Sequence, residues 1–324
     1  MRAIRLHAFG PAENLVCEDV PDLLPAEGQV RIDVQASGVH LIETRLRRGV
    51  GVGPHLPPEL PTTLGGEVAG VVGAVGSGVG TGWLGRRVVA QLGAGGGYAE
   101  QAVASADSVH VLPEHLDAET AVAVVTNGAT AQGVLGVANL TTDDVVLVMS
   151  AAGGLGSLFV QAAHHAGVTV VGVAGGDARA ARARELGADV AVDYQDADWP
   201  ALVREALDGR AVSVVLDGVG GVLGRQALEL LGPGGRFLMY GWAAGEPTAI
   251  TTRDLVEREL TATWAIGPNA TPSGGWRELA ARALEEAAAG RLVPLMTRFL
   301  LERAADAHSA LEAREAEGKV VLTI

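Results

Sequence analysis

From residue 145 onward, apolar runs alternate regularly with segments in which apolar residues recur at helical spacing. Val145–Met149 reads as a buried strand, and apolar residues in 155–165 follow the i, i+3, i+4 pattern of a helix. Further strands are predicted at 168–173, 190–192, 212–216 and 237–240, with helices between them at 178–186, 200–207 and 222–231. This uninterrupted order predicts a parallel, doubly wound sheet. Asp177 is expected to cap the helix at 178–186.

The first 120 residues have a different pattern. Short strands are predicted at 3–6, 30–36, 66–75, 87–91, 99–103 and 109–112, separated by Gly- and Pro-containing turns. A helix is expected at 119–135, and after residue 240 a strand at 258–266, helices at 275–289 and 304–315, and a last strand at 319–324. We therefore expect an α/β chain in which a Rossmann domain (123–265) is inserted into a mostly antiparallel β domain (1–122 plus 266–324).

The turn after Val145–Met149 consists of small residues, Ser150 to Gly154. A glycine turn that opens a helix leaves unpaired backbone N–H groups at the positive end of the helix dipole. A pyrophosphate binds well at such a helix start. Compared with the G-x-G-x-x-G fingerprint, the chain has Ala151 in first place and keeps Gly153 and Gly156. This match is weak alone and gains weight from the alternating elements around it.

The composition of the chain limits the classes of partner that it can bind. The net charge of −14 argues against nucleic acid or an anionic membrane as the main partner, since both favour dense Lys and Arg. The single cysteine, Cys17, excludes an intramolecular disulfide. No apolar run approaches the ~18 residues needed to span a bilayer, and the N-terminal segment lacks a signal-peptide core. These features predict a cytoplasmic protein.

Several motifs in order resemble one family. They are GVHLIETRLRRG (38–49), LPTTLGGEVAGVV (60–72), GGYAE (96–100), NGATA (127–131), SAAGGLGSLFVQAA (150–163), ELGAD (185–189), LDGVGG (216–221) and GKVVL (318–322). The chain resembles the medium-chain dehydrogenase/reductase superfamily, in its zinc-independent quinone oxidoreductase (ζ-crystallin-like) branch. The resemblance implies a Rossmann domain joined to a GroES-like domain, NADPH as cofactor, hydride transfer to quinones or activated double bonds, and a dimer or tetramer.

The resemblance also allows a test for metal. Zinc-containing members carry a Cys within the segment that is here Val39 to Leu41, and a His where this chain has Gly66. His40 and Glu67 alone are too few ligands for a tetrahedral site. We therefore expect no metal.

The second predicted strand indicates which nicotinamide cofactor binds. An NAD site ends this strand with Asp or Glu, whereas residues 171–176 contain no acid. The resemblance places Arg179 and Tyr194 beside the 2′-phosphate of NADPH. Arg179 could instead only solvate its helix, as we expect for Arg182 and Arg184, and Asp177 could approach a ribose.

Catalysis is expected to involve His40, Thr130 and Tyr240, because the resemblance places Thr130 and the segment from Tyr240 to Trp242 near the nicotinamide. Many relatives have Asn where His40 stands. A histidine there could hydrogen-bond the carboxamide of the cofactor, could donate a proton to the reduced substrate, or could be a packed side chain. Arg45, where relatives often have Tyr, could with Arg47 and Arg48 favour an anionic acceptor or belong to a solvated loop.

The residues expected to bind the cofactor are Thr130, Ala152, Gly153, Gly154, Leu155, Gly156, Gly175, Gly176, Arg179, Tyr194, Val219, Tyr240, Gly241, Trp242, Ile266 and Arg314. Lys319 is a further candidate by analogy. Asp217 is expected to shape the turn that follows it, and His164 and His165 to be solvated. The strand at 258–266 could pair with its twin in a homodimer.

Three functions stay open from the sequence. The first is NADPH-dependent reduction of a quinone. The second is reduction of an enone or another activated C=C bond on the same scaffold. The third is NADPH binding with little turnover.

Overall fold

A computed structural model describes residues 1–53, 55–93 and 95–324. The chain forms two compact units, each held together by its own contacts. The first unit comprises Met1–Thr126, Ala283–Ala289 and Pro294–Ile324, and the second comprises Asn127–Arg282 and Gly290–Val293. Residues 266–282 thus belong to the second unit by contacts, whereas the sequence places the domain boundary before residue 266.

The first unit contains a mostly antiparallel sheet in the order β14-β15-β3-β4-β5-β7, with β6 paired to β3. Only β14 and β15 run parallel. Its strands are β3 Gln29–Val39, β4 Glu67–Val75, β5 Arg87–Gln91, β6 Gln101–Ser105, β7 Val109–Val111, β14 Met296–Leu300 and β15 Lys319–Thr323. A separate hairpin joins β1 Arg2–Leu6 to β2 Leu15–Asp19.

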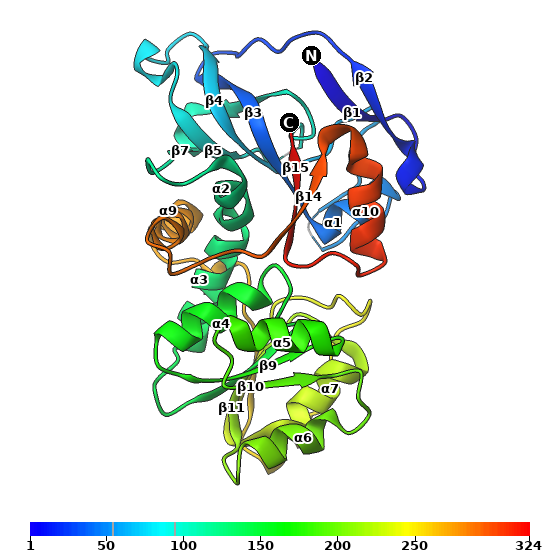
Figure 1. The fold of residues 1–324 in the computed structure, drawn as a ribbon, viewed down its shortest axis with the longest axis vertical. Coiled ribbons are helices and arrows are strands. Elements are labelled where there is room, and N and C mark those ends of the chain that lie inside the picture. Colours follow the sequence, from blue (N-terminus) through cyan, green and yellow to red (C-terminus); the bar gives the residue numbers. More distant parts are fainter. Residues whose placement is uncertain (54, 94) are drawn as a thin grey trace. The chain divides into compact units, whose positions relative to one another are not determined.

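Short helices complete the first unit. They are α1 Leu41–Arg47, α2 Ala118–Val125 and α10 Ala304–Glu312. Asp117 caps α2, because its side chain accepts a hydrogen bond from the backbone N–H of Thr120. α10 lies beside α1 and the end of β14 (Figure 1).

The second unit is a six-stranded parallel sheet in the order β10-β9-β8-β11-β12-β13. Its strands are β8 Val145–Met149, β9 Thr169–Ala174, β10 Val190–Asp193, β11 Val212–Asp217, β12 Leu231–Met239 and β13 Thr261–Trp264. Its helices are α3 Asn127–Ala138, α4 Gly156–His165, α5 Asp177–Glu185, α6 Trp199–Ala206, α7 Gly221–Leu230 and α8 Thr252–Glu257. α9 Gly275–Ala288 contributes residues to both units. The predicted doubly wound parallel sheet and the antiparallel β domain are both confirmed.

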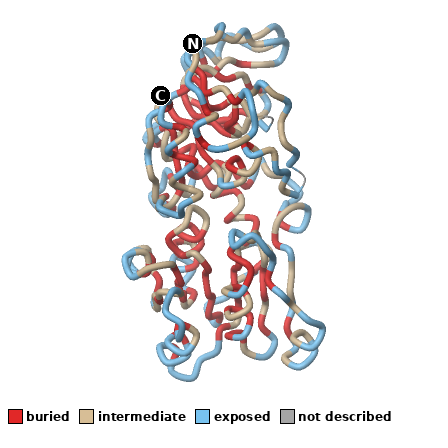
Figure 2. Tube along the Cα trace, turned by 90° about the vertical axis from the view of Figure 1, so that its right-hand side faces the viewer, coloured by how far each residue is buried: buried red, intermediate tan, exposed pale blue. Residues whose placement is uncertain are grey.

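Burial follows the strands in each unit, as the tube in Figure 2 shows. All five residues of β8 are buried, and the core of the second unit also contains Trp199 and Phe237. In β3 buried and accessible positions alternate along its first half, because one face of an antiparallel sheet packs inward. Burial of the apolar strand residues therefore holds each sheet together. The polar groups discussed below lie at the ends of these strands.

Some local predictions are wrong. The helix expected at 119–135 is two helices, α2 and α3, and residues 118–138 form one apolar stretch of 21 residues that is long enough to cross a membrane. Of the most apolar 18-residue window of this stretch, 67% is buried inside the protein, as is usual for helices that pack in a protein core. Asp177 does not cap α5; the cap position is Gly176, with φ of 93°, and Asp177 is the first helical residue.

Candidate functional site

In the second unit, the turn between β8 and α4 has the backbone geometry of an anion site. Ser150 has a positive φ of 54°, and its carbonyl accepts the N–H of Gly153 at 2.8 Å. α4 begins with no side-chain cap. Among the described residues, no backbone acceptor is assigned to the N–H groups of Gly154 and Leu155. These N–H groups lie at the positive end of α4 and can therefore hold a phosphate.

Two glycines of this turn have a steric purpose. A Cβ on Gly156 would lie 2.1 Å from the carbonyl oxygen of Ser150, and one on Gly153 would lie 3.0 Å from it. Helix and strand thus approach too closely for any side chain at Gly156. Ala151 can replace the first glycine of the fingerprint because it packs inward, where its Cβ faces Gly172 of β9.

The end of β9 brings together residues predicted to contact the cofactor phosphate. Tyr194 packs on Gly175, since a Cβ on Gly175 would lie 3.0 Å from the tyrosine ring. Arg179 lies on the first turn of α5, and its guanidinium donates to the Gly175 carbonyl at 3.5 Å. The carboxylate of Asp193, which the sequence did not single out, accepts the N–H of Gly176 at 2.7 Å. This carboxylate therefore orders the backbone of the turn.

The ends of β11 and β12 form the next part of the same sheet edge. Asp217 accepts the N–H groups of Val219 and Gly220 at 2.8 and 3.0 Å and the hydroxyl of Thr248 at 2.6 Å. This confirms that Asp217 shapes its turn. The ring of Tyr240 lies over Gly218, where a Cβ would come within 2.3 Å of it.

Tyr240 is suited to donating a hydrogen bond and not to losing its proton. Burial, with Asp217 nearby, raises the pKa of its phenol far above the usual value. Its hydroxyl donates to the Met149 carbonyl at the end of β8, at 3.5 Å. Trp242 packs against Trp264 of β13, with ring centroids 5.3 Å apart. Thr130 lies half-buried on α3, and Gly241 and Ile266 are also half-buried in this unit.

In the first unit, sheet register brings three residues together that are far apart in sequence. β3 pairs with β15 through Val39 and Val320, so His40 follows its strand opposite Lys319. On its other side β3 pairs with β4 through Ser37 and Val68, which places Glu67 opposite Gly38. A Cβ on Gly38 would lie 2.1 Å from a carboxylate oxygen of Glu67, so only glycine leaves room for that side chain.

The three side chains form a tight cluster. Glu67 Oε1 lies 2.6 Å from Lys319 Nζ and 2.8 Å from His40 Nε2, and these two nitrogens are 2.8 Å apart. The carboxylate is fully buried and the Lys319 side chain is 3% exposed, whereas the His40 side chain is 23% exposed. Burial alone would raise the pKa of Glu67, but His40 and Lys319 outweigh it and hold that pKa well below its usual range. Among these three residues, His40 is the one that meets solvent.

A second buried layer supports His40. Glu43 of α1 accepts the backbone N–H of His40 at 2.8 Å, that of Gly66 at 3.0 Å and the hydroxyl of Tyr98 at 2.6 Å. The Tyr98 oxygen in turn lies 3.1 Å from His308 Nε2, which donates to it because the tyrosine proton is already used. Burial, with Arg47, lowers the pKa of His308 to about 3. Burial, with the Glu43 carboxylate, raises the pKa of Tyr98 well above its usual value.

The cluster does not fit a tetrahedral zinc ion. Two ligand atoms on zinc lie about 3.3 Å apart at ordinary bond lengths, whereas His40 Nε2 and Glu67 Oε1 are 2.8 Å apart with an ammonium against both. Within the described ranges, no group of three or more His, Cys, Asp or Glu side chains is placed to hold a metal. Gly66, at the place of the zinc-ligating histidine, contributes only a backbone N–H, and it goes to Glu43.

Several predicted residues are placed differently from expectation. Arg47 is fully buried, with Nε 3.2 Å from the Gly10 carbonyl and Nη2 2.7 Å from Glu312, so it belongs to no solvated loop. Lys319 is ion-paired with Glu67 and is buried, which contradicts the analogy that took it to the cofactor phosphates. Arg314 follows α10 in the first unit with a positive φ of 59° and is exposed.

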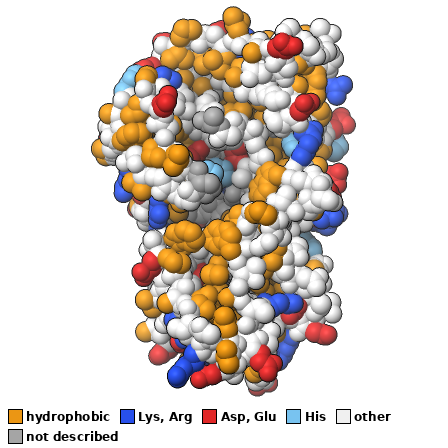
Figure 3. Space-filling view, turned by 180° about the vertical axis from the view of Figure 1, so that it is seen from behind, with side chains coloured by type: hydrophobic (Ala, Val, Ile, Leu, Met, Phe, Trp, Pro, Cys, Tyr) orange, Lys and Arg blue, Asp and Glu red, His pale blue; other side chains and the backbone are white. Residues whose placement is uncertain are grey.

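The remaining charged residues behave as surface groups. Arg182, Arg184, His164 and His165 are exposed, as predicted. Acidic and basic side chains are interspersed on the face drawn in Figure 3. The sequence missed Glu43, Tyr98 and His308, although Tyr98 lies within the GGYAE motif and so carried a signal.

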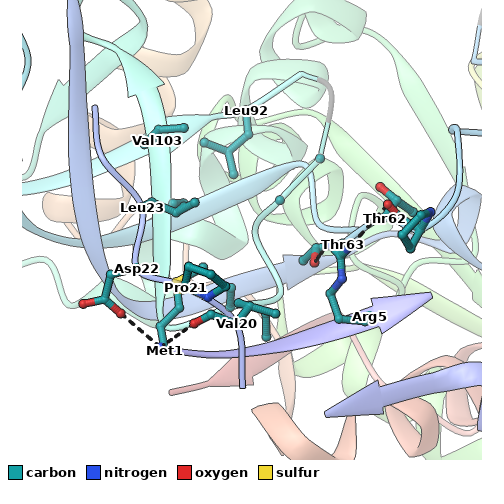
Figure 4. Close-up of a pocket in the computed structure, with 16 residues that line it drawn as sticks. Met1, Arg5, Val20, Pro21, Asp22, Leu23, Thr62, Thr63, Leu92 and Val103 are labelled. Atoms are coloured by element: carbon teal, nitrogen blue, oxygen red, sulfur yellow. Dashed lines mark hydrogen bonds and ion pairs between the residues drawn. The ribbon is translucent and has the colours of Figure 1, made fainter. Parts of the chain in front are cut away.

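The first unit also has an open pocket that is separate from this chemistry. Figure 4 shows Arg5, Thr62, Thr63, Leu92 and Val103 around it. At its rim the α-amino group of Met1 donates to the Val20 carbonyl at 2.9 Å and to Asp22 at 3.0 Å. None of the residues predicted to bind cofactor or substrate lines this pocket.

Comparison with known proteins supplies an independent view. Two family descriptions match the chain: "Alcohol dehydrogenase GroES-like domain" over residues 26–114 and "Zinc-binding dehydrogenase" over residues 154–286. The chain is 32% identical to a 2-haloacrylate reductase from a Burkholderia species, over 98% of this chain and 97% of that protein. It is also 32% identical to a quinone oxidoreductase of Pseudomonas aeruginosa, over 99% of each chain.

Among solved structures, it matches the Escherichia coli quinone oxidoreductase complexed with NADPH. The TM-score is 0.88, with 28% identity and complete coverage of both chains.

Proposed function

Because this chain belongs to the medium-chain dehydrogenase/reductase superfamily, in its quinone oxidoreductase branch, we propose that it is an NADPH-dependent oxidoreductase that reduces a quinone. The observation that carries the cofactor assignment is the end of β9, where Arg179 and Tyr194 adjoin Gly175. Asp193 accepts the backbone N–H groups of Gly176 and Gln195 through Oδ1, at 2.7 and 2.8 Å, so this oxygen orders the backbone at the edge. A guanidinium can hold a 2′-phosphate through two parallel hydrogen bonds.

Each part of the second unit has a task in this proposal. The free N–H groups of Gly154 and Leu155, with Ala152, Gly153 and Gly156 around them, bind the pyrophosphate. Gly175, Gly176, Arg179 and Tyr194 bind the ribose phosphate. The residues proposed for the nicotinamide end are Thr130, Val219, Tyr240, Gly241, Trp242 and Ile266. Arg314, which belongs to the first unit, is proposed as a cofactor ligand from the resemblance alone. NADPH, when bound, supplies a hydride.

His40 supplies the proton in this proposal. Its Nε2 lies 2.8 Å from both Glu67 Oε1 and Lys319 Nζ, and only the contact with Nζ has hydrogen-bond geometry. Because an ammonium can only donate, Nε2 accepts in this proposal and the ring proton lies on Nδ1. Nδ1–H then donates a hydrogen bond to the developing oxyanion. When this proton passes to the oxyanion, Nε2 takes a proton from Lys319 Nζ, so the imidazole stays neutral and Lys319 is left as an amine until solvent returns the proton. The hydroxyls of Thr130 and Tyr240 orient the acceptor, and the high pKa of Tyr240 keeps it a hydrogen-bond donor.

An activated C=C bond is the second candidate acceptor. The 2-haloacrylate reductase, at 32% identity over nearly the whole chain, supports it as well as the quinone oxidoreductases support a quinone. Both acceptors are electron-poor before binding, and the donor set around His40 and Glu67 does not fit a zinc ion that would activate a simple ketone. NADPH binding with little turnover is the third candidate.

Turnover separates these candidates. We expect the purified protein to oxidise NADPH rapidly with a 1,4-benzoquinone and more slowly with a 2-substituted acrylate. The reverse order would favour the C=C reductase, and tight NADPH binding with no turnover on either acceptor would favour the passive binder. Absence of NADPH binding in a calorimeter would refute all three.

The role of His40 has its own test. His40→Ala should lower kcat and flatten the pH–rate profile, while the exposed His164→Ala serves as the control. General acid catalysis contributes about 100-fold or more. An unchanged pH–rate profile in His40→Ala would remove His40 from the reaction.

We further propose a homodimer in the cytoplasm. β13 is the edge strand of the parallel sheet, so its free side can pair with a second copy, and Cys17 is an exposed free thiol that suits a reducing compartment. Thr261→Lys, at an exposed position of β13, should shift the protein to monomer in size-exclusion chromatography. A wild-type protein that elutes as a monomer would refute the dimer.

A further inference from the structure

The first unit contains the chain's single lysine, and it is buried. The sequence has 23 arginines and one lysine, Lys319, which is 4% exposed. Arginine thus serves at every other cationic position, including the fully buried Arg47. The exception at residue 319 indicates that this position requires something that a guanidinium does not provide.

The geometry around Lys319 identifies that requirement. Its Nζ lies 2.6 Å from Glu67 Oε1 and 2.8 Å from His40 Nε2, so one compact group contacts both side chains. An ammonium is a point charge with three donors in tetrahedral directions, whereas a guanidinium is a wide planar fork. The space between a carboxylate and an imidazole at this spacing accepts a small cation only.

The same space is where a divalent ion bound by His40 and Glu67 would have to lie. Glu67 is fully buried and carries its negative charge, which must be balanced locally because an unpaired buried charge is costly. Neither carboxylate oxygen of Glu67 has a hydrogen-bond partner among the described residues, so the balance rests on the ion-pair contacts of Oε1. Lys319 is the cationic side chain that lies 2.6 Å from this oxygen.

We propose that the ammonium of Lys319 is the resident cation of the first unit's site and stands in place of a metal ion. It neutralises Glu67, it fills the position between Glu67 Oε1 and His40 Nε2, and it fixes His40 with its ring proton on Nδ1. The matching family description names zinc, and this chain replaces zinc with part of its own β15. The inference does not depend on which acceptor is reduced.

Metal binding by position-319 variants tests the replacement. Wild-type protein dialysed against Zn²⁺ or Co²⁺ should retain no stoichiometric metal and show no change in Tm. Because His40 and Glu67 alone are too few ligands for a metal, the test adds a third ligand by Gly66→His, at a position where a Cβ meets only Glu43 Oε1, at 3.8 Å. Gly66→His with Lys319 in place should bind no stoichiometric Co²⁺. Gly66→His/Lys319→Ala should gain one equivalent of Co²⁺, visible as a d–d absorption band, and its Tm should rise by several degrees with metal. Stoichiometric metal in the wild type or in Gly66→His, or none in Gly66→His/Lys319→Ala, would overturn the proposal.

A spectroscopic measurement covers the case in which Gly66→His/Lys319→Ala does not fold. Because the chain has one lysine, protein labelled with ¹⁵Nζ-lysine gives a single side-chain signal, and this signal reports on the intact site. We expect an ammonium shift, slow proton exchange and no response to added Zn²⁺. A neutral amine shift, or a rapidly exchanging ammonium, would refute a buried resident cation. Lys319→Arg keeps the charge and is expected to lose the contact with His40 Nε2, seen as a changed ¹⁵N shift of that nitrogen, because the planar group cannot occupy the same position.

Discussion

The two units form their candidate sites from different kinds of chemical group, backbone amides in one and charged side chains in the other. The second unit uses backbone N–H groups and glycines, and its turn after β8 requires no buried charge. The first unit buries a carboxylate and an ammonium and places a partly exposed imidazole within 2.8 Å of both. The backbone site depends on the close approach of helix and strand, so a substitution that adds atoms to its glycines disrupts it. The buried charged site depends on the balance of opposite charges, so a substitution that removes one charged partner disrupts it.

The largest expected effect comes from unbalancing the charged site. Glu67→Gln leaves the Lys319 ammonium buried without its carboxylate, so the free energy of unfolding should fall by about 3–5 kcal/mol. Urea denaturation at pH 7 measures it. The control is Glu119→Gln, which removes a half-exposed pair with Arg298 and should cost about 1 kcal/mol or less. Equal losses in the two variants would show that the buried cluster contributes no more than a surface pair.

Adding atoms to the backbone site should have the next largest effect. Gly156→Ala places a methyl group 2.1 Å from the Ser150 carbonyl, so the turn must shift. We expect a loss of about 1–3 kcal/mol in stability and about 100-fold in NADPH affinity, or about 2.7 kcal/mol. Calorimetric titration measures the affinity. Gly136→Ala on α3 is the matched control, because a Cβ there meets nothing within 4 Å and should leave binding unchanged. Unchanged NADPH affinity in Gly156→Ala would remove the turn from the cofactor site.

Removing a single charge at the cofactor phosphate should cost less. Arg179→Ala is expected to weaken NADPH binding by about 1.5–3 kcal/mol, the scale of one charged hydrogen bond, and to leave NADH binding nearly unchanged. Arg182→Ala, exposed on the same helix, is the control and should change neither. Equal losses for the two cofactors would contradict the assignment of Arg179 to the 2′-phosphate.

The smallest effect is a pH dependence from the layer behind His40. His308 is neutral when folded, because burial lowers its pKa from the usual 6.5 to about 3, so the unfolded chain binds a proton first as the pH falls. Stability should therefore decline from pH 6.5 downward by up to about 1.4 kcal/mol per pH unit. The carboxylate of Glu67 adds its own loss only below about pH 4.5, as its lowered folded pKa is approached.

Urea midpoints between pH 5 and 7 isolate the histidine. His308→Gln should flatten this slope, and the exposed His164→Gln should not. A slope that persists in His308→Gln would assign the acid lability to another group.

The contrast between the units also explains what the sequence could predict. The turn from Ser150 to Gly156 is local, so its small residues and the flanking periodicity reveal both structure and chemistry. His40, Glu67 and Lys319 are adjacent only through the register of β3, β4 and β15, and no local pattern encodes a pairing between residues so far apart. The helix of residues 41–47 was missed for a related reason, because its Arg47 is polar yet buried by a partner, Glu312, from a distant helix.

The burial of the chain's single lysine has a practical consequence. Amine acylation of the folded protein finds no accessible side chain among the described residues, since Lys319 is 4% exposed. Modification of that amine must await a separation of β15 from β3 at this end of the sheet. The rate at which a small anhydride acylates Lys319 therefore measures the rate of this local opening. Mass spectrometry of the Lys319 peptide follows it without any engineered label.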